Sequence, residues 1–406
     1  MSTPNKRRPG IRALILTGDL GDGHRQAARA LAEARGAVGR PQVETEVVDY
    51  MQEVYTLLHP VIKYGFLHGV EKLPFLYGYF YRRSRESMEL SAAARSFLRL
   101  GQSRLEELLK AKQPDLVICT FPLAAAAVSL LKEKGRCSAA LVTVITDYAD
   151  HALWVQPHTD LFLVGSEKVA RALEKRGIAE SRISVTGIPV RTSFFGGGDR
   201  ASYRSELGLD PKRQVVLVMG GGWGLMTEET RSLIRSPLVR ERLQLVFLCG
   251  SNEKARRLLE KELASMPTPH VRILGFTEEV HRWMGSADLL LTKPGGLTTS
   301  EAIASGLPML LYKPIPGQEE ENAKALVEAG VAIRASKDRR LLDQLLELAQ
   351  SKAKLEEMRL KAGRLRREQP VRRAWAVMLK LPVGSEGAGL AVRPAVAVRE
   401  SMREAW

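Results

Sequence analysis

The sequence has few of the side chains that hold metals or form disulfides. Its 406 residues include seven His and three Cys, and no two cysteines have the Cys-x-x-Cys spacing of a metal or redox site. Isolated cysteines are typical of a protein from a reducing, cytoplasmic compartment. We therefore expect no disulfide framework, no bound metal and no cofactor.

Long hydrophobic runs are also lacking. No apolar run approaches the roughly 20 residues that a membrane-spanning helix needs. The N-terminus carries Lys6, Arg7 and Arg8, but the apolar run that follows them is too short for a signal peptide. We expect a soluble or peripheral protein.

Acidic residues are the minority charge. The chain has 61 Lys and Arg against 46 Asp and Glu, a net charge of +15, which favours nucleic acid or an anionic membrane surface as a partner. The excess is largest in residues 352–373, with nine basic and three acidic side chains. These basic residues match no recognisable nucleic-acid-binding module, so we expect no nucleic-acid partner. A solvated helix face is the alternative for residues 352–373.

Most of the chain alternates short apolar runs with helical periods, which is typical of parallel sheets covered by helices on both faces. The first series of predicted strands is 13–17, 46–48, 116–121, 141–146, 161–164 and 183–186. The second series is 215–219, 245–248, 271–274, 289–291, 309–311 and 331–333. We predict an α/β fold with two doubly wound, Rossmann-like domains and a ligand cleft between them, at the carboxyl ends of the strands.

The predicted domain boundaries follow from composition. Residues 1–190 form the first domain, and residues 214–370 form the second. The stretch 191–213 contains Gly196-Gly-Gly198 and Pro211 with little apolar content, and we interpret it as a linker. Residues 371–406 are expected to form a C-terminal helix and tail that pack back on the first domain.

The most informative segment is Thr292-Lys-Pro-Gly-Gly-Leu-Thr-Thr-Ser-Glu301. Gly295 and Gly296 interrupt a buried strand, and Thr298 with the next two residues is expected to cap the helix that carries Glu301. A helix N-terminus presents free N–H groups to a diphosphate. A carboxylate one turn into the helix accepts hydrogen bonds from two sugar hydroxyls. The pattern indicates a nucleotide joined to a sugar.

Two histidines follow predicted strands. His24 lies at the start of a helix after a glycine-rich turn, where the local positive potential keeps an imidazole neutral and able to accept a proton. Asp147 and His151 are four residues apart and would share a face of a helix, as a base and its orienting partner. The alternatives are a structural turn at His24 and plain loop residues at His151. A dinucleotide fold is a weaker alternative, because the spacing is not Gly-x-Gly-x-x-Gly.

One segment departs from the alternating pattern. Residues 50–81 hold nine of the nineteen Tyr and Phe residues of the chain, with Lys, His and Arg among and after them. Aromatic rings beside cations suit a membrane interface. The alternative is an aromatic helical layer inside the domain.

In their order along the chain, these motifs resemble those of glycosyltransferase family 28, in the branch that glycosylates diacylglycerol. The resemblance covers roughly residues 11–335. Its motifs are Gly21-Asp-Gly-His24, Thr120-Phe-Pro122, Thr146-Asp147 with His151 and Trp154, Thr186-Gly-Ile-Pro-Val-Arg191, Gly220-Gly-Gly222, Thr292-Lys-Pro-Gly-Gly296 with Glu301, and Tyr312-Lys-Pro-Ile-Pro-Gly-Gln-Glu319 with Asn322.

The resemblance implies a GT-B architecture and an inverting, metal-independent hexosyltransferase. The donor would be UDP-glucose or UDP-galactose, and the acceptor the 3-hydroxyl of 1,2-diacylglycerol, so that the product is a membrane glycolipid. The enzyme would be peripheral, on the cytoplasmic face of the cell membrane, with an anionic membrane surface as a further partner. The alternatives are a UDP-N-acetylglucosamine transferase acting on a lipid-linked peptidoglycan precursor and a non-catalytic nucleotide-sugar sensor.

The resemblance also implies roles for particular residues. His24 would be the general base, with Asp147 as its rival. The first domain would take up the acceptor and the membrane, with contacts at Tyr55, Phe66, Phe75, Tyr77 and Trp154. The second domain would bind the UDP-sugar through Arg191, Gly220, Gly221, Gly222, Phe276, Gly295, Gly296, Thr298, Glu301, Gln318, Glu319 and Asn322. Within that set, Glu301 would hold the ribose, and Gln318, Glu319 and Asn322 the sugar.

Overall fold

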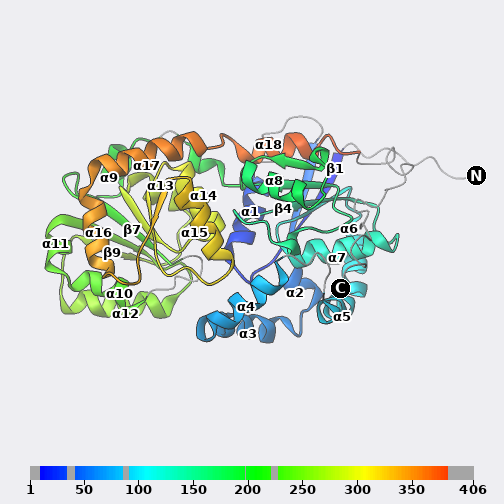
Figure 1. Ribbon diagram of the computed structural model, residues 1–406, viewed down its shortest axis with the longest axis horizontal. Coiled ribbons are helices and arrows are strands. Elements are labelled where there is room, and N and C mark those ends of the chain that lie inside the picture. Colours follow the sequence, from blue (N-terminus) through cyan, green and yellow to red (C-terminus); the bar gives the residue numbers. More distant parts are fainter. Residues whose placement is uncertain (1–9, 34–41, 86–90, 197, 221–226, 383–406) are drawn as a thin grey trace, which may run out of the picture.

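Two α/β halves lie side by side in the computed structural model (Figure 1), which describes residues 10–33, 42–85, 91–196, 198–220 and 227–382. Within these residues each half is built on a six-stranded sheet, and every pairing of neighbouring strands is parallel. The strand order is β2-β1-β3-β4-β5-β6 in the first sheet and β12-β11-β10-β7-β8-β9 in the second. The predicted fold class is confirmed.

Every predicted apolar run overlaps a strand, and the strands inside each sheet are largely apolar because parallel strands are buried on both faces. Those of the first sheet are β1 (Gly10–Thr17), β2 (Gln42–Asp49), β3 (Leu116–Cys119), β4 (Ala140–Val144), β5 (Leu161–Val164) and β6 (Ile183–Val185). Those of the second are β7 (Gln214–Met219), β8 (Leu243–Leu248), β9 (Val271–Leu274), β10 (Leu289–Thr292), β11 (Met309–Leu311) and β12 (Ala332–Arg334).

Helices cover both faces of each sheet. In the first half these are α1 (Asp22–Glu33), α2 (Tyr50–Val54), α3 (His59–Lys72), α4 (Pro74–Ser84), α5 (Ala92–Leu100), α6 (Gln102–Lys112), α7 (Pro122–Glu133) and α8 (Glu167–Lys175), with the short η2 (Ala152–Trp154) and η3 (Glu180–Arg182). Later in the chain come η4 (Thr192–Phe195), α9 (Arg200–Glu206), α10 (Glu228–Ser232), η5 (Leu233–Arg235), α11 (Pro237–Arg242), α12 (Glu253–Ser265), α13 (Val280–Ser286), α14 (Gly296–Ala304), α15 (Gln318–Glu328), α16 (Leu341–Gln350), α17 (Lys352–Leu365) and α18 (Pro370–Met378).

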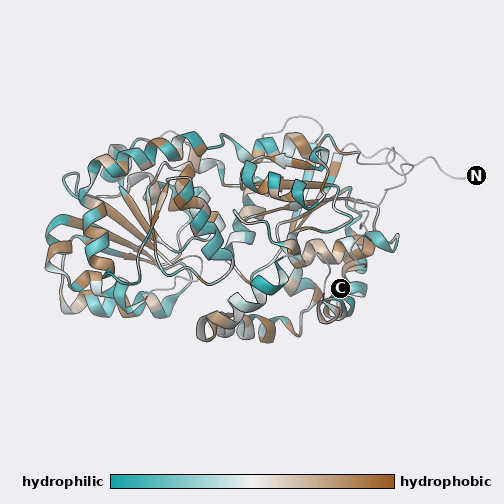
Figure 2. Cartoon of the chain, in the orientation of Figure 1, coloured by the Kyte–Doolittle hydropathy of each residue, from teal (hydrophilic) through white to brown (hydrophobic). Residues whose placement is uncertain are grey.

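The core follows from the pleat of the strands, since successive side chains of a strand point to opposite faces of the sheet. On β1, Leu14 and Leu16 pack into one apolar cluster with α7, while Ala13 and Ile15 pack into another on the opposite face. The strands at the centre of each half are accordingly the most hydrophobic elements in Figure 2.

Two segments outside the regular series pack onto a sheet or its helices. Helix α9 lies within the stretch predicted to be a linker, and Arg204 in it donates to the carboxylate of Asp288 at the start of β10. Helix α18 crosses back to the first half (Figure 1), where the buried side chain of Trp375 packs beside Leu31 and donates from Nε1 to its carbonyl at 2.9 Å.

Because Trp375 is 0% exposed in the core of the first half, Trp375→Ala is expected to lower the free energy of unfolding by about 3–5 kcal/mol, the range for large-to-small core substitutions. Trp375→Phe keeps most of the apolar contact and loses the hydrogen bond, so it is expected to cost less. Calorimetric unfolding of both variants measures the difference. Equal stability of Trp375→Ala and the parent protein would show that α18 contributes nothing to this core.

Candidate active site

Loops from both halves meet at the carboxyl ends of the strands. The first sheet changes direction of winding between β1 and β3, and the second between β7 and β10. Ligands of doubly wound folds bind at such switch points. Gly23, after β1, lies opposite Leu297 of α14, and Thr146, after β4, touches Gly296 of α14. The segments with the predicted motifs are therefore brought together across the boundary of the two halves.

His24 lies in the first turn of α1 and is held by groups from the segments that follow β3 and β4. Its Nδ1 is 3.1 Å from the hydroxyl of Thr146, and the hydroxyl of Thr120 donates to its carbonyl at 3.0 Å. The rings of Phe121 and Trp154 lie against the imidazole at centroid distances of 5.4 and 5.8 Å. Burial lowers the pKa of His24, and the charge of Asp147 only partly opposes this effect. The imidazole is therefore neutral near pH 7 and able to accept a proton.

Asp147 is buried and accepts hydrogen bonds on both carboxylate oxygens. Its Oδ1 accepts from the side-chain amides of Gln318 and, at 3.4 Å, Asn322. Its Oδ2 accepts from Nε1 of Trp154 at 3.3 Å. Two of these three donors come from α15, so Asp147 connects the first half of the protein to the second.

Asp147 and His151 do not share a helix face, and the alternative of loop residues holds for this segment. The chain after β4 forms bends, and His151 precedes the short helix η2, where its Nδ1 accepts from the amide of Leu153. Its Nε2 lies 3.2 Å from the carbonyl of Tyr81 and 3.3 Å from the hydroxyl of Ser84. His151 is thus held by α4 and does not orient Asp147.

The start of α14 also differs from the prediction. The helix begins at Gly296 with Gly295 as its N-cap, and the hydroxyls of Thr299 and Ser300 donate backwards to the carbonyls of Gly295 and Gly296. Capping by Thr298, Thr299 and Ser300 is therefore wrong. A Cβ on Gly296 would lie 1.9 Å from the carbonyl oxygen of Thr146, so only glycine permits this approach of the two backbones.

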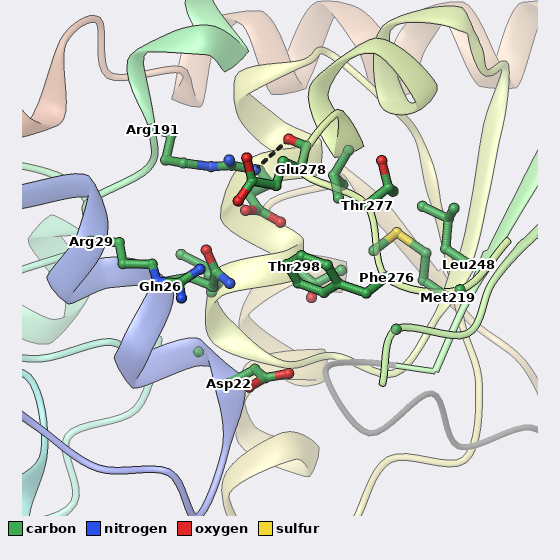
Figure 3. Close-up of a pocket in the computed structure, with 16 residues that line it drawn as sticks. Asp22, Gln26, Arg29, Arg191, Met219, Leu248, Phe276, Thr277, Glu278 and Thr298 are labelled. Carbon is green, nitrogen blue, oxygen red and sulfur yellow. Dashed lines mark hydrogen bonds between the residues drawn. The ribbon is translucent and has the colours of Figure 1, made fainter. Parts of the chain in front are cut away.

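A pocket lies between the two halves (Figure 3). Helix α1 forms one wall, and α14 forms the other with the ends of β7 and β8 and the loops after β8 and β9. Its lining residues are Asp22, Gly23, Gln26, Arg29, Arg191, Met219, Leu248, Gly250, Gly275, Phe276, Thr277, Glu278, Val280, Leu297, Thr298 and Glu301. Arg191, Phe276, Thr298 and Glu301 of the predicted donor site are thus brought together.

The charged residues that line this pocket include Glu301 and Arg191. Burial raises the pKa of Glu301 to about 7, although Arg191 acts in the opposite direction. Arg191 donates to the carbonyl of Glu278 at 3.0 Å, as the dashed line in Figure 3 shows. Its buried Nε has no hydrogen-bond partner among the residues that the structure describes. The pair offers a carboxylate for hydroxyl groups and a cation for an anionic ligand.

The other predicted donor residues have different surroundings. Glu319 accepts from the amide of Ile315 at 2.7 Å. Asn322 bridges the halves, because its Oδ1 accepts from the amide of Tyr148 at 2.8 Å and its Nδ2 donates to the carbonyl of Pro294 at 3.1 Å. Gly220 follows β7 and is buried, whereas Gly221 and Gly222 lie outside the described residues.

The predicted contacts with acceptor or membrane divide into buried and exposed residues. Tyr55 is 5% exposed and stacks on Phe97, and Trp154 is 3% exposed beside His24, so neither presents a surface to a membrane. Contact of either residue with the acceptor stays a prediction. Phe75 is 66% exposed and Phe66 is half-buried. The side chain of Tyr77 lies outside the described part of the structure.

Three side chains with the spacing of metal ligands occur away from this pocket, among the residues searched for such groups. The ligand atoms of Asp19, Asp49 and His59 lie within 4.8 Å of one another. Both oxygens of Asp19 are already paired, one with His59 Nε2 at 2.8 Å and the other with the ammonium group of Lys63. The arrangement is an ion-pair cluster that ties α3 to the loop before His24.

Gln26 and Arg29 were not predicted as site residues. Both line the pocket from α1 (Figure 3), although donor recognition was expected from the second domain. Asp22, Gln26 and Arg29 are spaced four and three residues apart, so they share one helix face. That spacing was the available signal, but nothing in the local sequence shows that this face meets the second half.

The comparisons identify the family. Two family models match, one described as monogalactosyldiacylglycerol (MGDG) synthase over residues 24–190 and one described as glycosyltransferase family 28 C-terminal domain over residues 215–373. A processive diacylglycerol beta-glucosyltransferase of Bacillus licheniformis is 31% identical over 348 residues, which cover 85% of this chain and 88% of that protein.

Solved structures agree on the fold. Acinetobacter baumannii MurG matches with a TM-score of 0.55 at 16% identity, and Anabaena Alr3699/HepE in complex with UDP and glucose matches with 0.52 at 15%. Both matches cover 91% of this chain and 99% of the other. Two facing Rossmann-like domains with a pocket between them define a GT-B architecture. The chain belongs to glycosyltransferase family 28, in its diacylglycerol glycosyltransferase branch.

Arg29→Ala is expected to weaken UDP-sugar binding by about 3- to 5-fold, because an exposed cation contributes up to about 1 kcal/mol. Arg25→Ala removes the same charge from α1 at a position that does not line the pocket, so it is expected to bind normally. Titration calorimetry measures both. Equal affinities in the two variants would mean that α1 takes no part in donor binding.

Proposed function

We propose that the protein transfers glucose from UDP-glucose to the 3-hydroxyl of 1,2-diacylglycerol, with inversion at the anomeric carbon. The proposal is carried by one observation: Gly23, which directly precedes His24, lines the same pocket as Glu301. The base candidate and the donor-site carboxylate are therefore close to one cavity. Membership in the diacylglycerol glycosyltransferase branch defines the acceptor class. Glucose is chosen over galactose because the similar Bacillus licheniformis protein is named a beta-glucosyltransferase.

The donor site would combine a carboxylate, a cation and a helix N-terminus. Glu301 would accept hydrogen bonds from the ribose hydroxyls. Arg191, whose Nε has no hydrogen-bond partner within the described part of the chain, would meet the diphosphate. Thr298, in the first turn of α14, lies where free N–H groups favour an anion. These groups stabilise the charge that develops on UDP as it leaves. Phe276, which is 62% exposed in the pocket, offers a ring face to uracil.

His24 would act as the general base. Its Nδ1 lies against the hydroxyl of Thr146, and among the residues that the structure describes Nε2 has no hydrogen-bond partner, so Nε2 can face the acceptor hydroxyl. As that hydroxyl oxygen bonds to the anomeric carbon, Nε2 takes its proton and the bond from carbon to the diphosphate oxygen breaks. Because both oxygens of Asp147 already accept hydrogen bonds, we assign Asp147 to orientation of Gln318 and Trp154.

Helices α3 and α4 are the proposed membrane contact. They expose Val61, Tyr64, Phe75 and Tyr79 at 52–71%, and Figure 1 shows them below the boundary of the two halves. Exposed apolar and aromatic groups of this kind mark interaction sites. None of the helices in the described residues is both long and apolar enough to cross a bilayer. We infer peripheral attachment at the cytoplasmic face.

The basic stretch 352–373 is less suited to this role. Arg359 pairs with Asp288, Lys361 pairs with Glu357, and Arg367 pairs with Glu167. Arg359 and Arg367 therefore connect this stretch to other parts of the protein, whereas the pair of Lys361 and Glu357 lies within α17. Their pairing supports assigning the membrane contact to α3 and α4.

The function is tested by a radiolabelled transfer assay with diacylglycerol liposomes. UDP-glucose, UDP-galactose and UDP-N-acetylglucosamine are supplied in parallel, and a glucolipid is expected from UDP-glucose. A galactolipid made from UDP-galactose in place of a glucolipid would change the transferred sugar in the proposal and leave the proposed acceptor unchanged. Failure of all three donors, with UDP-glucose binding intact, would contradict the proposed acceptor.

His24→Ala is expected to lower kcat by about 10²- to 10⁴-fold, the contribution of a positioned general base. UDP-glucose binding is expected to stay within about twofold, because His24 acts on the acceptor. Asp147→Asn keeps one carbonyl oxygen that can accept a hydrogen bond from Gln318 or Trp154, so kcat is expected to fall less in this variant than in His24→Ala. The reverse order of the two effects would make Asp147 the base.

The affinity for UDP-glucose is expected to fall about 10-fold between pH 8 and pH 6. The ribose hydroxyls need the ionised carboxylate, and a group with a pKa of about 7 goes from mostly charged to mostly neutral across this window. Glu301→Gln is expected to bind weakly and without this pH dependence. UDP-glucose is the appropriate ligand, because the terminal phosphate of UDP itself titrates near pH 6. A flat profile for the parent protein would exclude this role for Glu301.

A further inference from the structure

Helix α4 has two adjacent faces with different surroundings. Phe75 and Tyr79, four residues apart, are exposed at 66% and 52%. Gly78, Tyr81 and Arg85 are spaced three and four residues apart, so they form a second face. This second face meets the loop that leads into α15, in the other half of the protein. One helix therefore touches both solvent and the second half.

The contact between α4 and this loop is close. A Cβ on Gly78 would lie 2.5 Å from Cβ of Pro316, and a Cβ on Gly317 would lie 2.8 Å from the ring of Tyr81. Gly317 has a φ of +100°, a conformation that L side chains rarely adopt. It is the N-cap of α15 and directly precedes Gln318 and Glu319. The position of α4 thus limits where the first turn of α15 can lie.

Arg85, which follows α4, adds an ionic connection. One Nη donates to Glu321 in the first turns of α15, and the other donates to Asp150 of the first half at 3.1 Å. Asp150 is held in turn by Arg176 at 3.0 Å. Arg85 therefore connects the end of α4 with the segment after β4 in its own half and with α15 in the second half.

The charges in this network depend on one another. Burial raises the pKa of Glu321, and Arg85 is the strongest of the charges that act against this. Burial also disfavours the charge on Asp150, but hydrogen bonds from Arg85 and Arg176 outweigh it and lower its pKa. Removing Arg85 would leave the half-buried Glu321 carboxylate without its closest cation, which is unfavourable for the present position of α15.

The neighbouring helix α3 has a similar connection to the other side of the site. Asp19, in the loop between β1 and α1, pairs with His59 and Lys63 of α3. That loop leads to His24 five residues later. The α3–α4 pair is consequently attached both to the base-bearing loop and to the turn with Gln318.

We propose that Arg85 is a positioning residue that couples the seating of α3–α4 on a membrane to the geometry of the donor-sugar turn at Gln318 and Glu319. This inference rests on the proposed function, in which α3–α4 contact the membrane and that turn holds the sugar. Membrane contact then tightens the binding of the sugar part of the donor. The coupling acts through Arg85 and Glu321 and through the packing of α4 on Pro316 and Gly317.

The test measures the affinity for UDP-glucose and for UDP by calorimetry, with and without vesicles of phosphatidylcholine and phosphatidylglycerol that contain no diacylglycerol. Vesicles are expected to tighten UDP-glucose binding of the parent protein by about 5-fold or more, the lower end of measured couplings between sites. Affinity for UDP is expected to change less than about twofold, because UDP lacks the sugar. A protein with no vesicle response would overturn the proposal.

Arg85→Ala and Glu321→Gln are each expected to abolish the vesicle response while still sedimenting with vesicles. Glu321→Gln keeps the size of the side chain, so it provides a second variant if Arg85→Ala does not fold. Arg83→Ala removes an exposed cation from the same helix and is expected to keep the full response. A full response in both Arg85→Ala and Glu321→Gln would overturn the proposal.

The outcome also separates this proposal from the transferase function. A vesicle response that depends on Arg85, in a protein that makes no glycolipid, would contradict the proposed acceptor and support the coupling. Glycolipid synthesis without a vesicle response would support the function and contradict the coupling.

Discussion

The two halves of the protein meet backbone to backbone where Gly296 approaches the carbonyl of Thr146. A side chain at position 296 would overlap that oxygen, so the approach requires glycine. Around this contact, Asn322 accepts from the amide of Tyr148 and donates to Pro294, while Gln318 donates to Asp147. Buried polar groups of this kind lose their partners if the halves separate, which is unfavourable. The site is therefore a property of the closed pair, and neither half holds it alone.

Burial between the two halves also shifts the pKa values of His24 and Glu301. Burial lowers the pKa of His24 and raises the pKa of Glu301 to about 7, because it disfavours the charged form of each. For His24 the effect is useful, since a neutral imidazole is the form that accepts a proton. For Glu301 the same effect opposes the ionised form that accepts hydrogen bonds, and Arg191 offsets it only in part. Burial thus favours the proposed role of His24 as a base and opposes the proposed role of Glu301 as a hydrogen-bond acceptor.

The sheets could be predicted from the sequence, whereas several contacts at the site could not. Strands such as β5 and β11 were located because a strand inside a parallel sheet is continuously apolar, which is a local signal. The start of α14 was misplaced because Thr298–Ser300 resemble a cap, and only the approach to Thr146 explains an earlier start. The burial of Tyr55 and Trp154 could not be predicted from the sequence, because burial of an aromatic ring depends on tertiary neighbours. Arg29 was missed for the same reason, since its helix face meets the second half only in the folded chain.

The aromatic segment, residues 50–81, shows what composition predicts and what only the tertiary structure reveals. Its composition indicated a membrane interface or a packed layer, and the structure divides the segment, because Tyr55 is buried in the core while Phe75 and Tyr79 are exposed. A lipid acceptor has to reach a base without its chains leaving an apolar environment, so the surface that meets the bilayer must lie close to that base. The pairing of Asp19 with His59 and Lys63 keeps α3 beside the His24 loop, and Arg85 keeps α4 beside α15. Charged contacts on the inner side of α3–α4 therefore keep its apolar outer side close to the site.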